Sequence, residues 1–207
     1  ESPVAAGLLG GFVQAVCGGA LYRKSSFLLD SLGTKVFPKH IDISEDPHVL
    51  RGKGSSPFDD EGVKTQPRDI IHNGQVQGYF LSSYSARKLG MQTTGNSGGS
   101  HNLVMRSTQT RSEDDLKAML KKLGTGLLVI ELMGQGINYV TGDYSRGAAG
   151  FWVENGAISH PVDGITVAGN LKAIFSGIEA VGRDVDRRSH VGVGSILVGR
   201  MTVAGAD

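Results

Sequence analysis

Residues 134–161, GQGINYVTGDYSRGAAGFWVENGAISHP, decide the fold of this 207-residue chain. They contain the only tryptophan, Trp152, within a strand-forming patch, and the pair Asn155-Gly156 follows shortly after it. An Asn-Gly pair suits a type I′ turn, because both central residues of that turn take a positive φ. We therefore predict a β-hairpin here, which the chain enters through a glycine-rich segment.

The sequence before this hairpin predicts a helix followed by a strand. Ser112 and Asp115 resemble a capping box and start a helix over residues 113–123 that ends at Gly124. The run 127–133 is short and almost wholly apolar, which indicates a strand covered on both faces. Other strands are predicted at residues 103–105, 165–167, 190–196 and 201–203.

Two further helices have clear end signals. Asn170 is placed to cap a helix that runs to about residue 181 and closes at Gly182. Residues 83–89 predict one or two helical turns that close at Gly90. Residues 68–81 alternate around a second Asn-Gly pair and predict a second hairpin.

The N-terminal segment, residues 2–22, carries no charge. Its apolar side chains recur at helical spacing, with Ser2 placed to cap the helix and Pro3 at its first position. Half of residues 4–21 are glycine or alanine, and Gln14 lies among them. This composition favours close packing inside the protein over contact with lipid, so we expect no membrane span.

The whole pattern predicts one domain over residues 1–207. It is of the α+β class and β-rich, with mixed and antiparallel sheets, hairpins and three or four helices. No internal repeat or linker interrupts it. Because the chain opens at Glu1 and turns at once into an apolar pattern, we expect a fragment that lacks an upstream domain.

Charge and cysteine content narrow the functional classes. The chain has 21 Lys and Arg against 20 Asp and Glu, so no general attraction to nucleic acid or an anionic membrane is expected. The single cysteine, Cys17, cannot form an internal disulfide, which fits a reducing compartment such as the cytoplasm. We expect Cys17 to be a small buried residue on a helix.

Three consecutive carboxylates, Asp59, Asp60 and Glu61, stand before Gly62. Such a group can hold a hard cation or act in acid-base chemistry, but consecutive side chains usually point in different directions and form a solvated turn. The glycine-rich loop 93–100 lacks the lysine of a P-loop, so it fits a surface loop or a rim that faces a peptide.

Two segments carry a family resemblance. Residues 134–156, GQGINYVTGDYSRGAAGFWVENG, and residues 160–185, HPVDGITVAGNLKAIFSGIEAVGRDV, resemble the C-terminal domain of the TldD/PmbA family. The family is associated with a cytoplasmic zinc metalloprotease that trims peptides, including the leader of a microcin antibiotic. Its zinc-bearing and zinc-less types are thought to pair, and the resemblance places this chain on the zinc-less side.

The resemblance also implies where metal ligands would stand. Zinc-bearing, TldD-type members carry HExxxH on a helix, with a later cysteine as a further ligand. The matching positions here are Val13, Gln14 and Gly18, and the cysteine position falls near Val193. None of these side chains supplies a donor suited to zinc or a general base.

The histidines offer no replacement for that motif. The first of the six is His40, and no two are three or four residues apart, so none pair on one helical turn. A Ser-His-Asp triad stays open, although no Gly-x-Ser-x-Gly elbow supports one.

The resemblance therefore implies a subunit without its own metal or catalytic residues, whose zinc is held by a TldD-type partner. Whether the chain has activity of its own stays open. Implied partners are the TldD-like subunit, a second copy in a dimer, and a peptide substrate. Candidate contact residues are Thr94, Gly95, Asn96, Thr141, Gly142, Asp143 and Tyr144, which equally fit structural turns.

Two other functions remain open. The chain fits a peptide-binding or regulatory module without a proteolytic role, which would add a peptide strand to a sheet edge. It also fits an independent hydrolase that uses Asp59, Asp60 and Glu61 with another metal.

Overall fold

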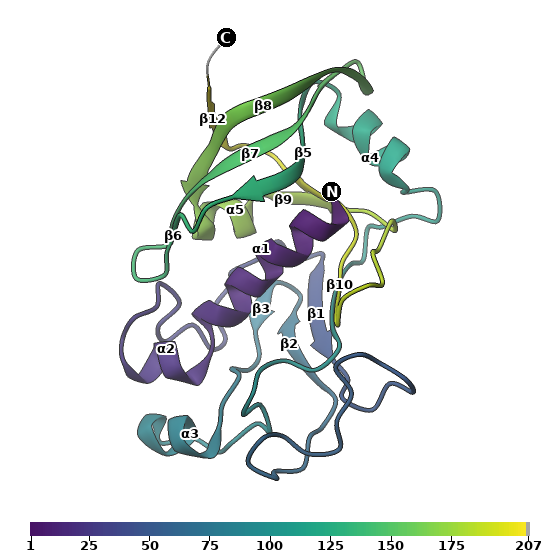
Figure 1. The fold of residues 1–207 in the computed structure, drawn as a ribbon. Helices are drawn as coiled ribbons and strands as arrows, with labels where there is room; N and C mark the ends of the chain where they lie inside the picture. The colour runs from purple at the N-terminus through teal and green to yellow at the C-terminus, as the bar shows by residue number, and fades with distance from the viewer. Residues whose placement is uncertain (206–207) are drawn as a thin grey trace.

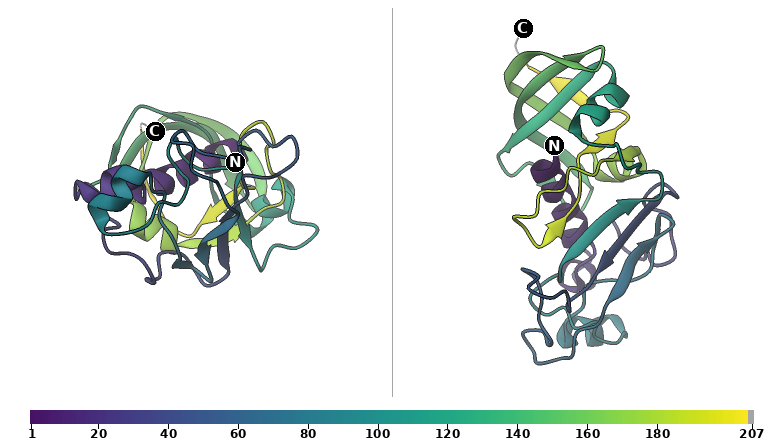
Figure 2. Two further views of the ribbon diagram at one scale, coloured as in Figure 1. Left: turned by 90° about the horizontal axis from the view of Figure 1, so that it is seen from below. Right: turned by 90° about the vertical axis from the view of Figure 1, so that its right-hand side faces the viewer.

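The computed structural model describes residues 1–205. Two five-stranded sheets lie end to end along the molecule, and helix α1, Ser2–Ala15, runs between them (Figures 1 and 2). We call them the upper and lower sheets, after their places in Figure 1. The predicted α+β class with mixed and antiparallel sheets is confirmed, and the described residues contain five helices.

The lower sheet has the strand order β10-β4-β1-β2-β3. All its neighbours pair antiparallel except β10 and β4, which are parallel. Its strands are β1 Ile41–Glu45, β2 Arg68–His72, β3 Gln75–Val76, β4 Leu103–Ser107 and β10 Val191–Gly192.

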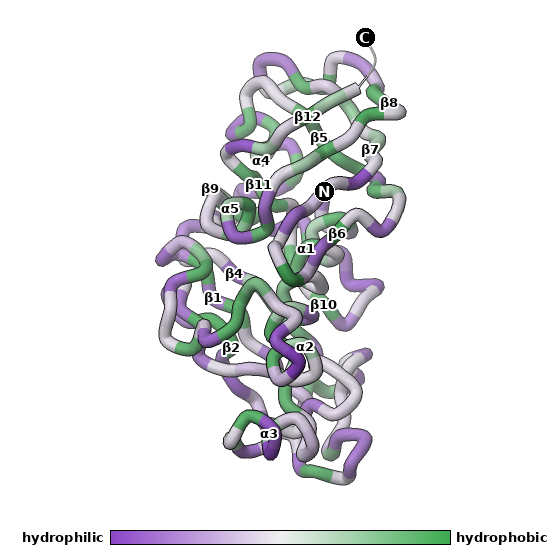
Figure 3. Tube along the Cα trace, turned by 90° about the vertical axis from the view of Figure 1, so that its left-hand side faces the viewer, coloured by the Kyte–Doolittle hydropathy of each residue, from purple (hydrophilic) through white to green (hydrophobic). Residues whose placement is uncertain are grey.

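The upper sheet has the order β12-β8-β7-β5, with β6 paired to β7 beyond the end of β5. A separate pair, β9 and β11, completes the strands. The tube of the upper sheet changes repeatedly between apolar and polar colours in Figure 3, as expected for strands with unequal faces. The strands are β5 Gly126–Met133, β6 Ile137–Asn138, β7 Asp143–Glu154, β8 Ala157–Asn170, β9 Ile178–Val181, β11 Ile196–Val198 and β12 Thr202–Ala204.

Both Asn-Gly hairpins are confirmed. Asn155 and Gly156 have φ values of 52° and 75° and join β7 to β8. Asn73 and Gly74, at 49° and 78°, join β2 to β3 in the same way. Both turns therefore use the left-handed backbone that the two residue types tolerate.

Four helices follow α1. Asn170 caps α5 as predicted, whereas α4 is capped by Asp115 and not by Ser112. Asn170 accepts a hydrogen bond from the backbone of Lys172, and Asp115 accepts one from Ala118. The predicted helix over residues 83–89 is confirmed, with Ser82 as its cap. These helices are α2 Gly18–Tyr22, α3 Ser83–Leu89, α4 Leu116–Leu123 and α5 Leu171–Ser176.

Several helix limits differ from the prediction. The helix after Asn170 ends at Ser176, because the next residues pair with β11 as strand β9 and so exchange helical for sheet hydrogen bonds. Helix α4 begins only at Leu116.

At the N-terminus the differences come from distant contacts. Ser2 is not the cap of α1; its hydroxyl donates to the carbonyl of Val193 instead, at 2.7 Å. Cys17 is not in a helix but lies, partly buried, at the break between α1 and α2. Its backbone forms an isolated parallel β-bridge with Phe80 there.

The expectation that residues 127–133 are covered on both faces was wrong. Ile130 and Met133 are 37% and 41% exposed. The physical reason is that β5 forms the edge of the upper sheet and shifts register against β7 between Val129 and Glu131.

An aromatic cluster joins α1, α5 and the loop before β1. The ring of Phe12 meets Phe37 edge-on, with centroids 5.1 Å apart, and Phe175 at 5.9 Å. Phe175 also stacks with Phe27 at 6.3 Å. Because these rings are buried and come from both halves, they fix α1 between the two sheets. No helix in residues 1–205 is long and apolar enough to cross a membrane.

Candidate functional site

The outer edge of β5 is unpaired in the described sheet and lies beside α1 (Figure 1). The amino group of Glu1 donates a hydrogen bond to the carbonyl oxygen of Val129 at 2.8 Å. A carbonyl of this strand therefore already accepts a donor that comes from outside the sheet. Unpaired strand edges of this kind are where extended chains can add.

A cavity of about 390 Å³ lies under the inner face of the upper sheet, between β5, α1, α4 and residues 195–203. Its wall is mostly apolar and includes Leu8 of α1, Leu120 of α4 and Leu132 of β5. In a strand added to an edge, alternate side chains face the same side. The cavity thus offers apolar space beside the free edge of β5.

The outward face of α1 has few side chains. Pro3, Gly7, Gly10 and Gln14 are exposed, and their spacing of three or four residues puts them on one side of the helix. A Cβ atom built on Gly7 or Gly10 would meet no other atom within 4 Å. The helix therefore presents nearly bare backbone on this face.

The positions compared with a zinc motif lie near the end of α1. Val13 is partly buried and Gln14 is exposed. A Cβ atom on Gly18 would lie 2.2 Å from the hydroxyl oxygen of Ser85, so a histidine does not fit there without a shift. Residues 1–205 contain no group of three His, Cys, Asp or Glu side chains arranged to hold a metal. The side chains at these positions therefore do not fit a zinc ion.

Val193 does not join those positions. It is 1% exposed, and its carbonyl accepts the hydroxyl of Ser2 at the opposite end of α1. Ser2 and Gln14 are about 18 Å apart along a helix that rises 1.5 Å per residue. The structure thus does not bring the helix positions and Val193 together.

A cation lies on the inner face of β7, near the end of β5. Arg146 alternates with the buried residues Tyr144 and Ala148, and its partner on β8 is the buried Val167. Its Nη2 atom donates to the carbonyl of Leu132 at 3.3 Å. Its Nε atom is enclosed and has no hydrogen-bond partner within residues 1–205.

Two tyrosines lie in the field of this arginine. Burial raises the pKa of Tyr144, and the charge of Arg146 together with a hydrogen bond from it acts in the opposite direction. Burial likewise raises the pKa of Tyr139, against the charge of Arg146. The guanidinium is therefore close to both phenol groups.

The predicted contact loop at Thr94, Gly95 and Asn96 faces inward. Asn96 is 5% exposed, and its side-chain amide donates to both carboxylate oxygens of Glu45, at 3.0 and 3.2 Å. Thr94 donates from its hydroxyl to the side-chain oxygen of Asn96 at 2.7 Å. These side chains hold the loop to the lower sheet.

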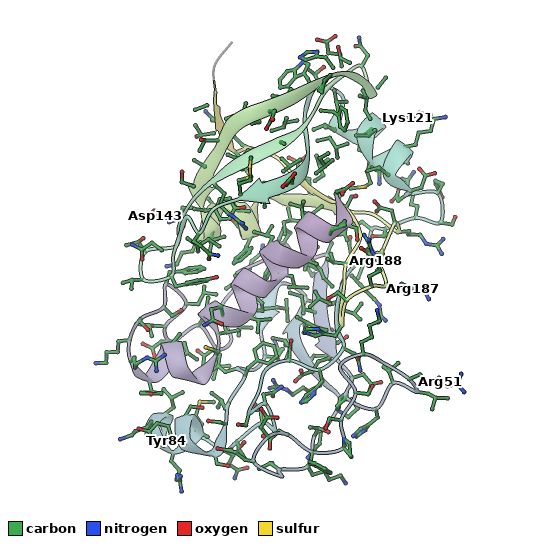
Figure 4. All side chains as sticks on the ribbon, in the orientation of Figure 1. Arg51, Tyr84, Lys121, Asp143, Arg187 and Arg188 are labelled. Atoms are coloured by element: carbon green, nitrogen blue, oxygen red, sulfur yellow. The ribbon has the colours of Figure 1, made fainter. Side chains whose placement is uncertain are left out.

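The other predicted contact turn, Thr141 to Tyr144, connects β6 to β7. Gly142 has a φ of 82°, which explains a glycine there. Asp143 is exposed at the margin of the upper sheet (Figure 4) and accepts the hydroxyl of Thr141 at 2.6 Å. That bond and one from Asn170 lower the pKa of Asp143. Tyr144 points inward instead, at 6% exposure.

The carboxylate run at Asp59 forms a turn, as its consecutive spacing indicated. Burial acts to raise the pKa of Asp59, but hydrogen bonds from the backbone of Ser97, Val63 and Glu61 outweigh it and lower the pKa. Asp60 is exposed. Asp59 is thus committed to the backbone of the turn, which leaves the hydrolase hypothesis without a cluster of carboxylates.

Sequence reasoning missed Arg146 and the free edge of β5. A signal for Arg146 was present, because a charged residue stands at an inward position of a strand between Tyr144 and Ala148. The free edge carried no comparable signal, since an apolar strand can be central or lateral.

The fold and this site define the C-terminal domain of a metallopeptidase family. A sequence model described as the PmbA/TldA metallopeptidase C-terminal domain matches residues 1–205, and the chain belongs to this family. The family resemblance found in the sequence is confirmed.

Particular relatives support the assignment. The chain is 54% identical to the metalloprotease PmbA of Escherichia coli O157:H7 over 202 residues, which cover 98% of this chain and 44% of the relative. It is 52% identical to a PmbA homologue of Haemophilus influenzae, with the same coverage. The chain therefore spans less than half the length of these relatives.

Two solved structures share the fold. One, from Bacteroides thetaiotaomicron, is a protein proposed to modulate DNA gyrase; it has a TM-score of 0.92 and 32% identity, over 100% of this chain and 46% of that one. The other is TldE from Thermococcus kodakarensis, with a TM-score of 0.81 and 24% identity, over 97% of this chain and 48% of that one.

Proposed function

We propose that this chain is the C-terminal domain of a zinc-less, PmbA-type subunit in a heteromeric cytoplasmic metalloprotease that processes or degrades peptides. A TldD-type partner supplies the zinc and the catalytic groups. The observation that carries the proposal lies at the end of α1 and the start of α2. In a chain 54% identical to a metalloprotease, the residues that the resemblance aligns with the motif, Val13, Gln14 and Gly18, supply no donor set for zinc.

The role of this chain in such an enzyme would be to bind and orient the peptide. The free edge of β5 can pair with an extended backbone, and the cavity beside it can take apolar side chains. Edge pairing uses hydrogen bonds to the peptide main chain, which do not depend on the side chains. It therefore suits peptides of varied sequence, including a leader segment such as that of a microcin. The proposal includes a dimer with the TldD-type subunit, or with a second copy of this chain.

The test uses the full-length protein that contains this chain, purified alone and together with the TldD-type protein of the same organism. Zinc content and hydrolysis of an unstructured peptide are measured for each sample. We expect zinc and hydrolysis only where the partner is present, and the replacement of the partner's HExxxH histidines should abolish both. Stoichiometric zinc with hydrolysis in the lone protein would overturn the proposal.

A matched pair of variants locates the catalytic groups. Gln14→Ala in this chain should leave hydrolysis by the pair unchanged, because Gln14 is exposed and is not a base. The corresponding glutamate of the partner should be essential. If Gln14→Ala removed activity while the pair still formed, catalysis would depend on this chain.

The second candidate is a peptide-binding or regulatory module without a proteolytic role. The free edge of β5 and its adjoining cavity favour it independently of any metal. The two candidates differ in what copurifies with the full-length protein from its own cells. Bound peptides without a peptidase partner would support the module, and a stable complex with a zinc peptidase would support the subunit.

A further inference from the structure

Among residues 1–205, Arg146 is a cation without an anionic partner. The four ion pairs in the described residues do not include it; Arg68 and Arg188, in contrast, pair with carboxylates at 2.7 and 2.8 Å. Its hydrogen bonds go to neutral acceptors, the carbonyl of Leu132 at 3.3 Å and the hydroxyl of Tyr144. Guanidinium groups that are taken partly out of water normally pair with a carboxylate or phosphate.

The guanidinium also has a free side. Nε is the only enclosed side-chain nitrogen or oxygen without a partner in residues 1–205. Arg146 as a whole is only half-buried, so the remainder of its side chain is not fully enclosed. An anion can therefore approach the Nη1 and Nη2 end while Nε stays covered.

The position of Arg146 restricts the kind of anion. Its Nη2 atom touches Leu132, the next-to-last residue of β5, and Leu132 lines the cavity beside the free edge of that strand. A chain that pairs with this edge would run past the guanidinium. Carboxylates are the anions that an extended peptide carries, and two parallel N–H donors match their geometry.

We propose that Arg146 binds a carboxylate of an extended peptide that lies along the free edge of β5, an inference that takes its substrate class from the proposed function. Tyr144, two residues away on the same face of β7, shields the guanidinium from water and strengthens the pairing. The site adds selection by charge to a strand edge that otherwise binds only the main chain of the peptide.

The test measures peptide binding by calorimetry in the full-length protein, complexed with a TldD-type partner whose catalytic glutamate is replaced. The probes are three acetylated peptides of Ala, Ser and Val, eight residues long like β5. One ends in a free carboxylate, one in a carboxamide, and one is a carboxamide with an internal aspartate. We expect the unmodified complex to bind at least one carboxylate peptide about tenfold more tightly than the neutral one.

The two carboxylate peptides separate the possible sources. Preference for the free C-terminus assigns the site to the end of a peptide, and preference for the aspartate assigns it to a side chain. Equal affinity for all three peptides would overturn the proposal without any variant, so the result does not depend on how a variant folds.

Variants then tie the preference to Arg146. Arg146→Gln should remove it and leave affinity for the neutral peptide unchanged, and Arg146→Lys should retain part of it, since lysine keeps the charge but loses the fork. Arg106→Gln is the matched control, because Arg106 is an exposed arginine on β4 of the lower sheet. Equal loss for charged and neutral peptides in Arg146→Gln would indicate a structural role and overturn the proposal.

This result is separable from the proposed function. Peptide hydrolysis by the unmodified pair tests the subunit assignment, whereas the carboxylate preference tests Arg146. If the pair cleaves peptides without that preference, the inference fails and the assignment stands. If no pair forms, the same titration of the full-length protein alone tests the carboxylate site by itself.

Discussion

The Nε atom of Arg68 donates a hydrogen bond to Oε1 of Glu45 at 2.7 Å and so joins β2 to β1 inside the lower half. The carboxylate also accepts the backbone N–H of His101 at 2.8 Å and the side chain of Asn96. Glu45 is 2% exposed, so its charge depends on these partners. The loop that holds Asn96 and the strand that holds Arg68 are both attached through this one side chain.

We expect Glu45→Ala to lower the free energy of unfolding by about 3 kcal/mol or more, because it removes the carboxylate that pairs with the charge of Arg68 and that accepts from His101 and Asn96. Urea unfolding of the full-length protein measures this loss. Glu154→Ala, at an exposed end of β7, is the control and should change stability by about 0.5 kcal/mol or less. Similar effects for the two variants would contradict the central role of Glu45.

Two glycines, Gly10 within α1 and Gly18 at the start of α2, should respond in opposite directions to alanine. Gly18→Ala places a Cβ atom 2.5 Å from the Cβ of Ser85 and should destabilise the protein by about 1–3 kcal/mol. Gly10→Ala meets no atom within 4 Å and should stabilise the helix by about 0.5–1 kcal/mol. Thermal unfolding checks both. A stabilising Gly18→Ala would mean that α2 and α3 are not packed as described.

Asp59 should make stability depend on pH in the acid range. Its pKa in the folded protein lies below the ordinary value of 3.8, so the folded state binds this proton less readily than the unfolded state. The stability that it contributes is complete above the unfolded pKa and is lost as the pH falls through the lower, folded-state pKa.

Asp59→Asn removes this dependence and should also lower stability at neutral pH by about 2 kcal/mol, since three backbone donors lose a charged acceptor. Urea unfolding at several pH values measures both effects. Asp60→Asn is the adjacent control and should retain the acid dependence, because Asp60 is exposed. An unchanged pH profile in Asp59→Asn would show that other groups account for it.

The packing of the β7–β8 hairpin turn can be tested at two glycines that have similar φ angles. Gly156 and Gly164 have φ values of 75° and 66°, so alanine at either should cost about 1 kcal/mol in backbone strain. A Cβ atom on Gly156 would also lie 2.9 Å from the Cα of Lys121 in α4, whereas one on Gly164 meets no atom within 4 Å. Gly156→Ala should therefore be the more destabilising of the two in urea unfolding. Equal losses would mean that α4 does not pack against the turn.

Much of the fold could be predicted because its signals are local. The Asn-Gly pairs at residues 73 and 155 set their turns by backbone preference alone, and Asn170 caps a helix through the residue two positions after it. Where a distant segment competed, prediction failed. Ser2 is a good local cap, yet its hydroxyl bonds to a carbonyl 191 residues away.

The candidate site was less accessible to prediction for the same reason. The lack of zinc donors at Val13, Gln14 and Gly18 could be read from residue types, but that Gly18 has no room for a larger side chain comes from its contact with Ser85. The loop at Asn96 was expected to be a surface feature, and only the buried Glu45 shows why it faces inward.

Residue chemistry along the chain was enough to establish the α+β class, the two hairpins and the family, because turn preference, alternation and motif spacing are properties of neighbouring residues. Packing in three dimensions decided that β5 stays at the edge beside α1 and that Arg146 has no carboxylate partner within residues 1–205. Neither fact is encoded in any short segment. A strand edge is free, and a charge is unpaired, only because no distant segment of the described chain packs against it.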